Sequence, residues 1–383
     1  MKIVIIVEYV INLTLLLIFS MHMFQLNSYF FKKHMHWMKK NIKKVVLQVL
    51  LVLIPSGLLL INNIVTDIVA IVILGISIFY NIPKGKSKIS LKLTSRVKRM
   101  FVTELILIVI GILILGIDKF IWQKLAILNI LSPIICNIVN LINSPIEYRV
   151  RKWYINDAKK ILKSMPNLTI IGVTGSYGKT SVKNFLDKTL SSKYEVLITP
   201  KNYNTTMGVV KTIRENLKPT HQIFVCEMGA TKLGDIKEIC DLVNPKIGVI
   251  TSIGPQHLES FKSIENVIKT KFELADSVKA NNGVVFLNYN NEYIAKQNPD
   301  MKVIKYGVEN KDLDYNAYNL MSSSNGLTFK LLDKDNNNKE IEFKTKLIGK
   351  HNIINITAAI AVANYLGINI EKTVPKIREI RRS

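Results

Sequence analysis

Apolar residues are concentrated in the first third of this 383-residue chain, where basic stretches divide them into four blocks. The blocks are residues 3–24, 45–80, 101–117 and 120–142. A helix that crosses the hydrocarbon layer needs roughly 20 apolar residues, so the second block is long enough for two passes, with a bend near Asn62 and Asn63. The pattern therefore predicts a membrane region of about five transmembrane helices within residues 1–143.

Two of these blocks have a second interpretation. The first could be a cleaved signal peptide, but it lacks a small-residue cleavage site and further apolar blocks follow it. The last contains Lys124, Asn129, Pro133 and Asn137, which suit an interfacial helix almost as well. Five spans remain our prediction, with an interfacial last helix as the alternative.

The basic residues between the blocks predict the orientation. The chain carries a net charge of +24, and its densest basic runs are residues 32–44 and 84–99, neither of which contains an acid. The positive-inside rule explains such loops better than binding to nucleic acid, so we expect membrane lipid and no nucleic acid as a partner. With the N-terminus outside, five crossings place both loops and all residues after Asn143 in the cytosol, which predicts a multi-pass protein of the cell membrane.

The three cysteines point to no additional chemistry. Cys136, Cys226 and Cys240 have neither disulfide-pairing spacing nor a metal-ligand pattern. We expect reduced cytosolic thiols.

The second half of the chain has an alternating pattern. A basic helix is predicted at residues 154–164, within a juxtamembrane segment at 144–167. Strand-like runs at 168–173, 223–226, 247–251 and 284–287 then alternate with helical patterns at 181–190, 233–242 and 263–278. This order predicts an α/β domain at 168–370, built on a parallel sheet with helices on both faces.

The sequence pattern changes toward the end of that domain. Residues 301–346 contain short alternating strands with polar turns, which predict a small antiparallel extension of the sheet. Helices are predicted at 351–365 and 371–382. The apolar side of the last helix, formed by Val374, Ile377 and Ile380, is expected to need a further segment to pack against.

A glycine-rich motif carries the clearest chemistry. Residues 172–181 read Gly-Val-Thr-Gly-Ser-Tyr-Gly-Lys-Thr-Ser, directly after a predicted strand and at the start of a predicted helix. This context indicates a phosphate-binding loop, although Val173 occupies the place of the first Walker glycine. Backbone amides would surround the phosphates, while the lysine supplies positive charge and the threonine hydroxyl ligates Mg²⁺. The predicted nucleotide-binding residues are Gly175, Ser176, Gly178, Lys179, Thr180 and Ser181.

Two further residues follow later strands, where open α/β sheets bind their ligands. Glu227 ends the second of these strands, and His257 follows the third. Separately, each could be an ordinary strand-end or loop residue. Beside a phosphate-binding loop, we interpret both as metal ligands. ATP is preferred to GTP because the chain has no Asn-Lys-x-Asp motif for reading guanine.

Taken together, the motifs resemble the Mur ligases, and most closely the members that add D-alanyl-D-alanine to a UDP-muramoyl tripeptide. The resemblance covers about 200 residues in six ordered motifs: the phosphate-binding loop, Asn-Tyr-Asn-Thr-Thr-Met-Gly at 202–208, Glu-Met-Gly-Ala at 227–230, Thr-Ser-Ile-Gly-Pro-Gln-His-Leu-Glu at 251–259, Lys-Phe-Glu-Leu at 271–274, and Gly-Lys-His-Asn at 349–352 with Asn355. It implies the fold of a Mur ligase central domain.

The resemblance also implies roles for individual residues. Lys179 would bind the phosphates, Thr180 and Glu227 would hold one Mg²⁺, and His257 a second. Asn204 matches an asparagine near the γ-phosphate. The implied catalytic residues are therefore Lys179 and Asn204, together with a lysine from the fifth motif.

That lysine is Lys271, which matches a lysine that is carbamylated in several family members. A lysine whose ammonium form is disfavoured by burial becomes a free amine, which can react with CO₂ and then ligate metal through oxygen. The alternative is an ordinary surface lysine. His351 and Asn352 match residues that read the edge of the adenine.

The chemistry implied by the resemblance is amide-bond formation. ATP would activate a substrate carboxylate to an acyl phosphate, and an amino group would attack it, as in acid–amino acid ligases. We expect a cell-wall, peptidoglycan-precursor-like carboxylate and an amino acid or dipeptide as the amine.

The sequence departs from the family in several places. Ser252 and Gln256 replace an expected asparagine and alanine, and Asn290 stands where an aspartate is common. Membrane helices replace the N-terminal domain that binds the UDP-sugar, which suggests a lipid-linked carboxylate. Residues 371–383 correspond to the start of the linker to a C-terminal domain. We therefore expect this chain to be incomplete alone and to work with a separately encoded C-terminal domain.

Other readings remain open. An ATP-binding membrane scaffold or subunit without ligase activity would show the same loop. A poly-γ-glutamate-synthase-like ligase would match in size and membrane attachment, although the loop is of Mur type. The lipid-amidating relatives have a four-cysteine metal ribbon that has no counterpart in this sequence.

Overall fold

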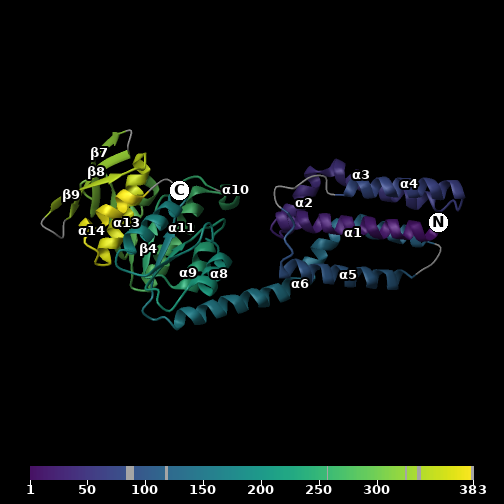
Figure 1. The fold of residues 1–383 in the computed structure, drawn as a ribbon, viewed down its shortest axis with the longest axis horizontal. Coiled ribbons are helices and arrows are strands. Elements are labelled where there is room, and N and C mark those ends of the chain that lie inside the picture. The colour runs from purple at the N-terminus through teal and green to yellow at the C-terminus, as the bar shows by residue number, and fades with distance from the viewer. Residues whose placement is uncertain (83–89, 117–119, 257, 324–325, 334–337, 381–383) are drawn as a thin grey trace. The chain divides into compact units, whose positions relative to one another are not determined.

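The computed structural model describes residues 1–82, 90–116, 120–256, 258–323, 326–333 and 338–380. It divides into two units, Met1–Val150 and Arg151–Ser383. We call them the helical unit and the α/β unit. Figure 1 shows helices in the first unit and a sheet with surrounding helices in the second.

The helical unit contains long apolar helices at the predicted blocks. They are α1 (Lys2–Leu26), α2 (Phe31–Lys40), α3 (Ile42–Leu58), α4 (Ile64–Asn81), α5 (Ser95–Leu115) and α6 (Ile121–Lys163). The predicted bend in the second block is confirmed, because α3 and α4 are separate helices. Asn62 has a φ of 54°, and the side chain of Asn63 caps α4 by accepting a hydrogen bond from the amide of Val65 at 2.9 Å.

Length and composition identify fewer membrane spans than the predicted five. Among the described residues, α1, α4 and α6 are long and apolar enough to cross a membrane, and α2 with α3, bent by 81°, would make a fourth if counted as one span. Helix α5 does not meet this test, and its first half carries Arg96, Lys98, Arg99 and Glu104. Five spans therefore stay a prediction.

Helix α6 runs without interruption from Ile121 to Lys163 and contains Pro133 and Pro145. The predicted last span and the predicted juxtamembrane helix are thus one helix. Its first part is mainly apolar and its last part is rich in basic residues. Its last turns belong to the α/β unit, where Tyr154 and Leu162 pack against the core.

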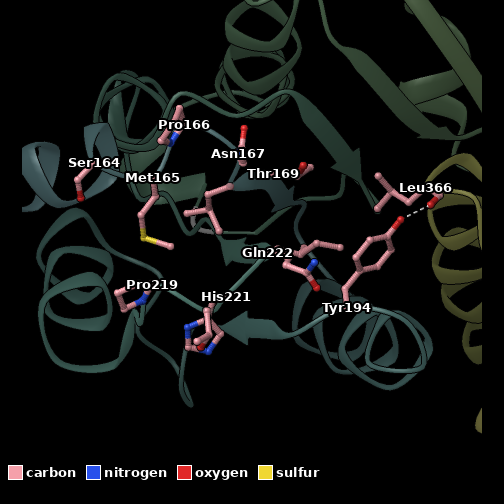
Figure 2. Close-up of a pocket in the computed structure, with 13 residues that line it drawn as sticks. Ser164, Met165, Pro166, Asn167, Thr169, Tyr194, Pro219, His221, Gln222 and Leu366 are labelled. Atoms are coloured by element: carbon pink, nitrogen blue, oxygen red, sulfur yellow. Dashed lines mark hydrogen bonds between the residues drawn. The ribbon is translucent and has the colours of Figure 1, made fainter.

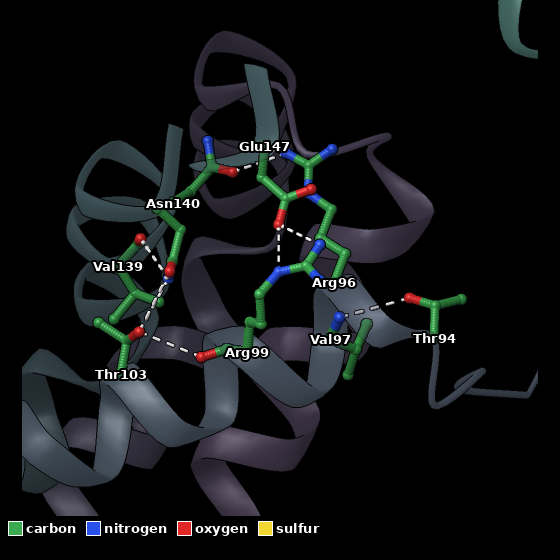
Figure 3. A network of polar contacts seen from close by, with 9 residues as sticks. Thr94, Arg96, Val97, Arg99, Thr103, Val139, Asn140 and Glu147 are labelled. Carbon is green, nitrogen blue, oxygen red and sulfur yellow. Dashed lines mark hydrogen bonds and ion pairs between the residues drawn. The ribbon is translucent and has the colours of Figure 1, made fainter. Parts of the chain in front are cut away.

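Polar side chains join α5 to α6 in the helical unit (Figure 3). The guanidinium of Arg99 forms an ion pair with Glu147 at 2.7 Å, and Arg96 donates to Asn140 at 2.8 Å. Such side-chain pairs fix how two apolar helices face each other, because apolar surfaces alone specify the contact only weakly in lipid.

The α/β unit contains a sheet of nine strands, counted over the residues that the structure describes. Its order is β2-β3-β1-β4-β5-β6-β7-β8-β9. The strands are β1 (Thr169–Thr174), β2 (Val196–Ile198), β3 (Ile223–Glu227), β4 (Ile247–Ile250), β5 (Val284–Asn288), β6 (Lys302–Val308), β7 (Tyr315–Ser323), β8 (Gly326–Asp333) and β9 (Lys339–Thr345).

Strand direction confirms the predicted parallel sheet and corrects its extent. All neighbours from β2 through β7 are parallel, whereas β7–β8 and β8–β9 are antiparallel. The antiparallel extension is therefore present, but β6 belongs to the parallel part, and the prediction for 302–308 is wrong in direction. Whether two neighbouring strands run parallel or antiparallel depends on how the chain packs in three dimensions. An alternating sequence pattern therefore could not show the direction of β6.

Helices cover both faces of this sheet (Figure 1). One face packs against α7 (Lys179–Leu190), α13 (Lys350–Tyr365) and α14 (Ile370–Glu379). The other packs against α8 (Thr206–Asn216), α9 (Asp235–Val243) and α11 (Ile264–Ala280), with the short helices α10 (Leu258–Phe261) and α12 (Glu292–Ala295) nearby in sequence. In β1, Ile170 faces the second layer while Ile171 and Val173 face the first, because successive strand residues point to opposite faces.

The last helix corrects a second expectation. Ile377 and Ile380 are buried in the core of the α/β unit, and Val374 packs against the same core. The apolar side of α14 is thus already covered by α7, α13 and β9, and it does not require a further segment.

Candidate nucleotide and metal site

The phosphate-binding loop connects β1 to α7, as the sequence predicted. Gly175 has a φ of 151° and Gly178 a φ of 84°, both in the region that favours glycine. A Cβ at Gly178 would lie 2.8 Å from Oδ1 of Asn355, so α13 also restricts this position to glycine. The loop ends at the N-terminus of α7, where free backbone amides favour an anion.

Residues that follow β4 hold the loop in place. The amide of Ser176 donates to the carbonyl of Ser252 at 2.6 Å, and the amide of Tyr177 donates to Oγ of Ser252 at 3.1 Å. Thr251 Oγ1 donates to the carbonyl of Tyr177 at 2.5 Å. Ser252, which departs from the family motif, therefore supports the loop through both its backbone and its hydroxyl.

Lys179 lies within the curve of this loop. Its Nζ donates to the carbonyls of Gly175 at 2.6 Å and Ser176 at 3.1 Å. Burial lowers the pKa of this ammonium, while the nearby Glu227 carboxylate acts in the opposite direction. The lysine is therefore a partly desolvated charge whose interaction with an anionic phosphate would be favourable.

The structure brings Thr180, Asn204 and Glu227 together at the carboxyl ends of β1 and β3. The hydroxyl of Thr180 is 3.2 and 3.1 Å from the two carboxylate oxygens of Glu227. Asn204 Nδ2 donates to Oε1 of Glu227 at 3.2 Å. Two motifs far apart in the sequence thus meet at one carboxylate. Among the described residues no group of three or more histidine, cysteine, aspartate or glutamate side chains is arranged to hold a metal, so a cation here would depend on hydroxyl and carboxylate oxygens.

Sequence analysis did not identify Lys183, which also reaches this cluster. Its Nζ lies 3.1 Å from Oε2 of Glu227, and both side chains are almost completely buried. The available signal was its spacing: Lys183 follows Lys179 by one helical turn and so lies on the same side of α7.

Lys271 is not a surface lysine. It lies on α11 with 3% of its surface exposed. Burial lowers its pKa to about 8, and repulsion from Lys179 contributes to the shift. The free-amine form is thus accessible near neutral pH, as carbamylation requires.

His351 and Asn352, the residues matched to adenine, line a cavity of about 680 Å³ at the start of α7. Thr180 and Ser181 line the same cavity. Asn352 Nδ2 donates to the carbonyl of Ile348 at 2.7 Å. His351 and Asn352 therefore share one cavity with Thr180 and Ser181, two of the residues predicted to bind the phosphates.

The remaining sequence candidates have other outcomes. His257 lies outside the described residues, so its predicted metal role stays a prediction. Asn290 exchanges hydrogen bonds with the backbone of Val308, donating at 3.0 Å and accepting at 2.7 Å, which is a structural role. The three cysteines are free and buried.

A second cavity, of about 500 Å³, lies at the opposite ends of the strands (Figure 2). Thr169 and Ile223, which begin β1 and β3, line it together with Tyr194, whose hydroxyl donates to the carbonyl of Leu366 at 2.5 Å. Parallel α/β sheets bind ligands at their carboxyl ends, so the candidate site is the cavity beside the phosphate-binding loop.

Comparison with known proteins supports the same assignment. Residues 173–363 match the family model of the Mur ligase middle domain. The chain therefore belongs to the Mur ligase family through this domain. The resemblance stated from the motifs is thus confirmed.

Curated relatives include the UDP-N-acetylmuramoyl-tripeptide–D-alanyl-D-alanine ligase of Bacillus subtilis, 31% identical over 199 residues, which are 52% of this chain and 42% of that protein. The enzyme of the same name from Haemophilus influenzae is 32% identical over 222 residues, 56% of this chain and 47% of that protein. The chain thus spans less than half the length of these two relatives.

Solved structures agree with the sequence comparison. The MurF ligase of Thermotoga maritima in complex with ADP matches with a TM-score of 0.55 and 25% identity, over 61% of this chain and 53% of that one. MurF of Acinetobacter baumannii matches with a TM-score of 0.55 and 26% identity, over 61% of this chain and 50% of that one.

Proposed function

We propose that this chain is an ATP-dependent ligase of Mur type, which joins a carboxylate to an amine through an acyl phosphate. The observation that carries the proposal is the convergence of Lys179, Thr180, Asn204 and Glu227 at the carboxyl ends of β1 and β3, beside the cavity that reaches His351.

The residues present fit a magnesium nucleotide. A hydroxyl and a carboxylate within 3.2 Å of each other are the hard oxygen ligands that Mg²⁺ prefers. The glycine-rich loop, the N-terminus of α7 and Lys179 fit the phosphates, and His351 with Asn352 would contact the base. The nucleotide would supply the phosphoryl group that activates the carboxylate.

The chain's own residues would then orient the reactants. Lys179 would neutralise phosphate charge, Asn204 would position the terminal phosphate, and Lys271 as a carbamate would supply anionic oxygens. Holding the reacting groups in line is the main contribution of a protein to phosphoryl transfer.

The substrates follow from the relatives' names and from the apolar helices. A peptidoglycan-precursor carboxylate and an amino acid or dipeptide amine are the proposed reactants. Helices α1, α4 and α6 would hold the α/β unit at the cytosolic face of the membrane, where it would meet lipid-linked as well as UDP-linked carboxylates. A further domain would complete the amine site.

The first test is nucleotide binding by the full chain in detergent. Lys179→Ala should reduce the affinity for a labelled ATP analogue by about tenfold to a hundredfold, because it removes a charge-assisted contact worth roughly 1.5–3 kcal/mol. Lys237→Ala, which removes an exposed lysine paired with Asp241, is the matched control. Equal affinity of Lys179→Ala and the wild-type chain would exclude the assigned site.

The second test is product formation. ADP release and amide product should be measured with UDP-linked and lipid-linked precursors and candidate amines, with and without added candidate partner domains. Lys271→Ala should impair the reaction, and acetate should partly restore it if the missing group is an anionic ligand. Rescue by a small amine would reject the carbamate. Nucleotide binding with no product under all conditions would favour the scaffold reading.

A further inference from the structure

Lys183 is the most buried charged group of the candidate site that the family motifs do not account for. Its side chain is 2% exposed. Besides Glu227, its Nζ donates to the backbone carbonyls of Thr199 at 2.9 Å and Lys201 at 3.0 Å. All three protons of the ammonium therefore have an acceptor, and the group is held at a fixed position between α7 and the segment after β2.

Lys183 forms an ion pair with the carboxylate that a metal ion would need as a ligand. Oε2 of Glu227 pairs with the ammonium group of Lys183, and Oε1 accepts a hydrogen bond from the side-chain amide of Asn204. The hydroxyl of Thr180 lies within hydrogen-bonding distance of both oxygens. A divalent cation at Glu227 must therefore compete with a buried positive charge already in contact with the same oxygen.

The surrounding charges increase this competition. Lys179 is close enough to Glu227 for the carboxylate to favour the charged form of this lysine. Asp187 lies one turn after Lys183 on α7, close enough for electrostatic attraction between the two side chains. Before a nucleotide binds, two ammonium groups, those of Lys183 and Lys179, lie in range of the single carboxylate of Glu227, so this position attracts phosphate and disfavours a free cation.

We propose that Lys183 is a positioning residue that makes metal binding depend on the nucleotide. It neutralises and orients Glu227 while the site is open, so that divalent metal enters together with the phosphates rather than before them. Phosphate oxygens bring the negative charge that offsets Lys183 and Lys179, and Glu227 then completes the metal's ligands. This inference rests on the proposed function of the site.

A purely structural role of Lys183 would predict the opposite change in the affinity for metal when the lysine is removed. If Lys183 only fastened α7 to the segment after β2, its loss would loosen Glu227 and weaken metal binding both with and without nucleotide. If it also screens Glu227, its loss strengthens the binding of metal alone.

The experiment measures Mn²⁺ binding by the full chain in detergent, from the electron paramagnetic resonance of free Mn²⁺ with and without ADP, after correction for the Mn²⁺ that ADP binds in matched protein-free samples. We expect ADP to tighten Mn²⁺ binding to the wild-type chain by about tenfold or more. In Lys183→Met, Mn²⁺ alone should bind about tenfold more tightly than to the wild-type chain, so the effect of ADP shrinks. Lys183→Arg should restore the dependence on ADP, and Lys237→Met is the matched control and should behave as the wild-type chain.

Several outcomes would overturn the inference. Weaker Mn²⁺ binding to Lys183→Met under both conditions would leave only the structural role. Equally tight Mn²⁺ binding to the wild-type chain with and without ADP would also reject it, and this measurement decides the matter if Lys183→Met fails to fold. Failure of the proposed nucleotide site would look different, because the wild-type chain would then not bind ADP at all, whereas failure of ligation alone would leave these Mn²⁺ and ADP measurements unchanged.

Discussion

The two units bury polar side chains in different ways. In the helical unit, α1, α3, α4 and α6 are connected mainly by neutral amides: Asn81 donates to Asn12 at 2.9 Å and accepts from Gln48 at 2.8 Å, and Asn12 donates to Asn129 at 3.3 Å. In the α/β unit, the buried polar side chains around the carboxyl ends of the strands include three charged ones, Lys183, Glu227 and Lys271.

This difference indicates what each set is for. Neutral amides lose little on burial once they are paired, and they specify which apolar helices face each other. Buried charges cost free energy even when they are paired, so charges gathered at one end of a parallel sheet indicate a binding site rather than a stabilising feature. Removing Lys271, whose charge costs free energy on burial, should therefore stabilise the α/β unit, whereas removing a paired amide should destabilise the helical unit.

The largest expected effect is at Lys271. Because the folded-state pKa is about 8 against an ordinary value of 10.5, the folded unit holds this proton less tightly than the unfolded chain does. The resulting cost is fully present below pH 8 and disappears as pH rises toward 10.5. Lys271→Met should therefore stabilise the α/β unit by roughly 2–3 kcal/mol at pH 7, and by less at pH 9. Hydrogen exchange of peptides from β1 and β4 measures this for the α/β unit alone. A destabilised Lys271→Met would show that the lysine contributes to folding.

A smaller effect is expected at Gly178. Its φ of 84° should cost an alanine about 1–2 kcal/mol, and the added Cβ would displace the side chain of Asn355. Gly178→Ala should reduce ATP-analogue affinity about fivefold to thirtyfold. Gly57→Ala in α3 is the matched control, because a Cβ there has no neighbour within 4 Å, and it should leave affinity unchanged. Normal affinity of Gly178→Ala would show that the loop tolerates a different backbone.

The smallest effect is expected at Asn81 in the helical unit. Asn81→Leu removes the contacts to Asn12 and Gln48 and leaves their buried amides without these partners. The cost should be about 0.6–1.7 kcal/mol, measured as faster hydrogen exchange in α1 and α4, with ATP-analogue affinity unchanged. Increased protection of α1 and α4 would contradict the structural role of the amides. Asn81→Leu and Lys271→Met would then both stabilise the unit in which they lie, so the expected difference between the two units would be lost.

Sequence alone determined the features that depend on nearby residues. The apolar blocks gave the long helices and the bend at Asn62 and Asn63, because length and local capping are local properties. The phosphate-binding loop was predictable because its glycines, lysine and threonine lie within one short motif. Strand and helix alternation likewise indicated the parallel sheet, although β2 and α8 were not identified.

Only the tertiary structure decided which distant residues meet. The direction of β6, the burial of Ile377 and the contact between Lys183 and Glu227 each depend on neighbours that are remote in sequence. Spacing placed Lys183 on the same side of α7 as Lys179, but it could not show that a carboxylate from β3 would lie 3.1 Å away. Such a contact is fixed by how the helix packs on the sheet, and packing depends on the whole core rather than on a local pattern.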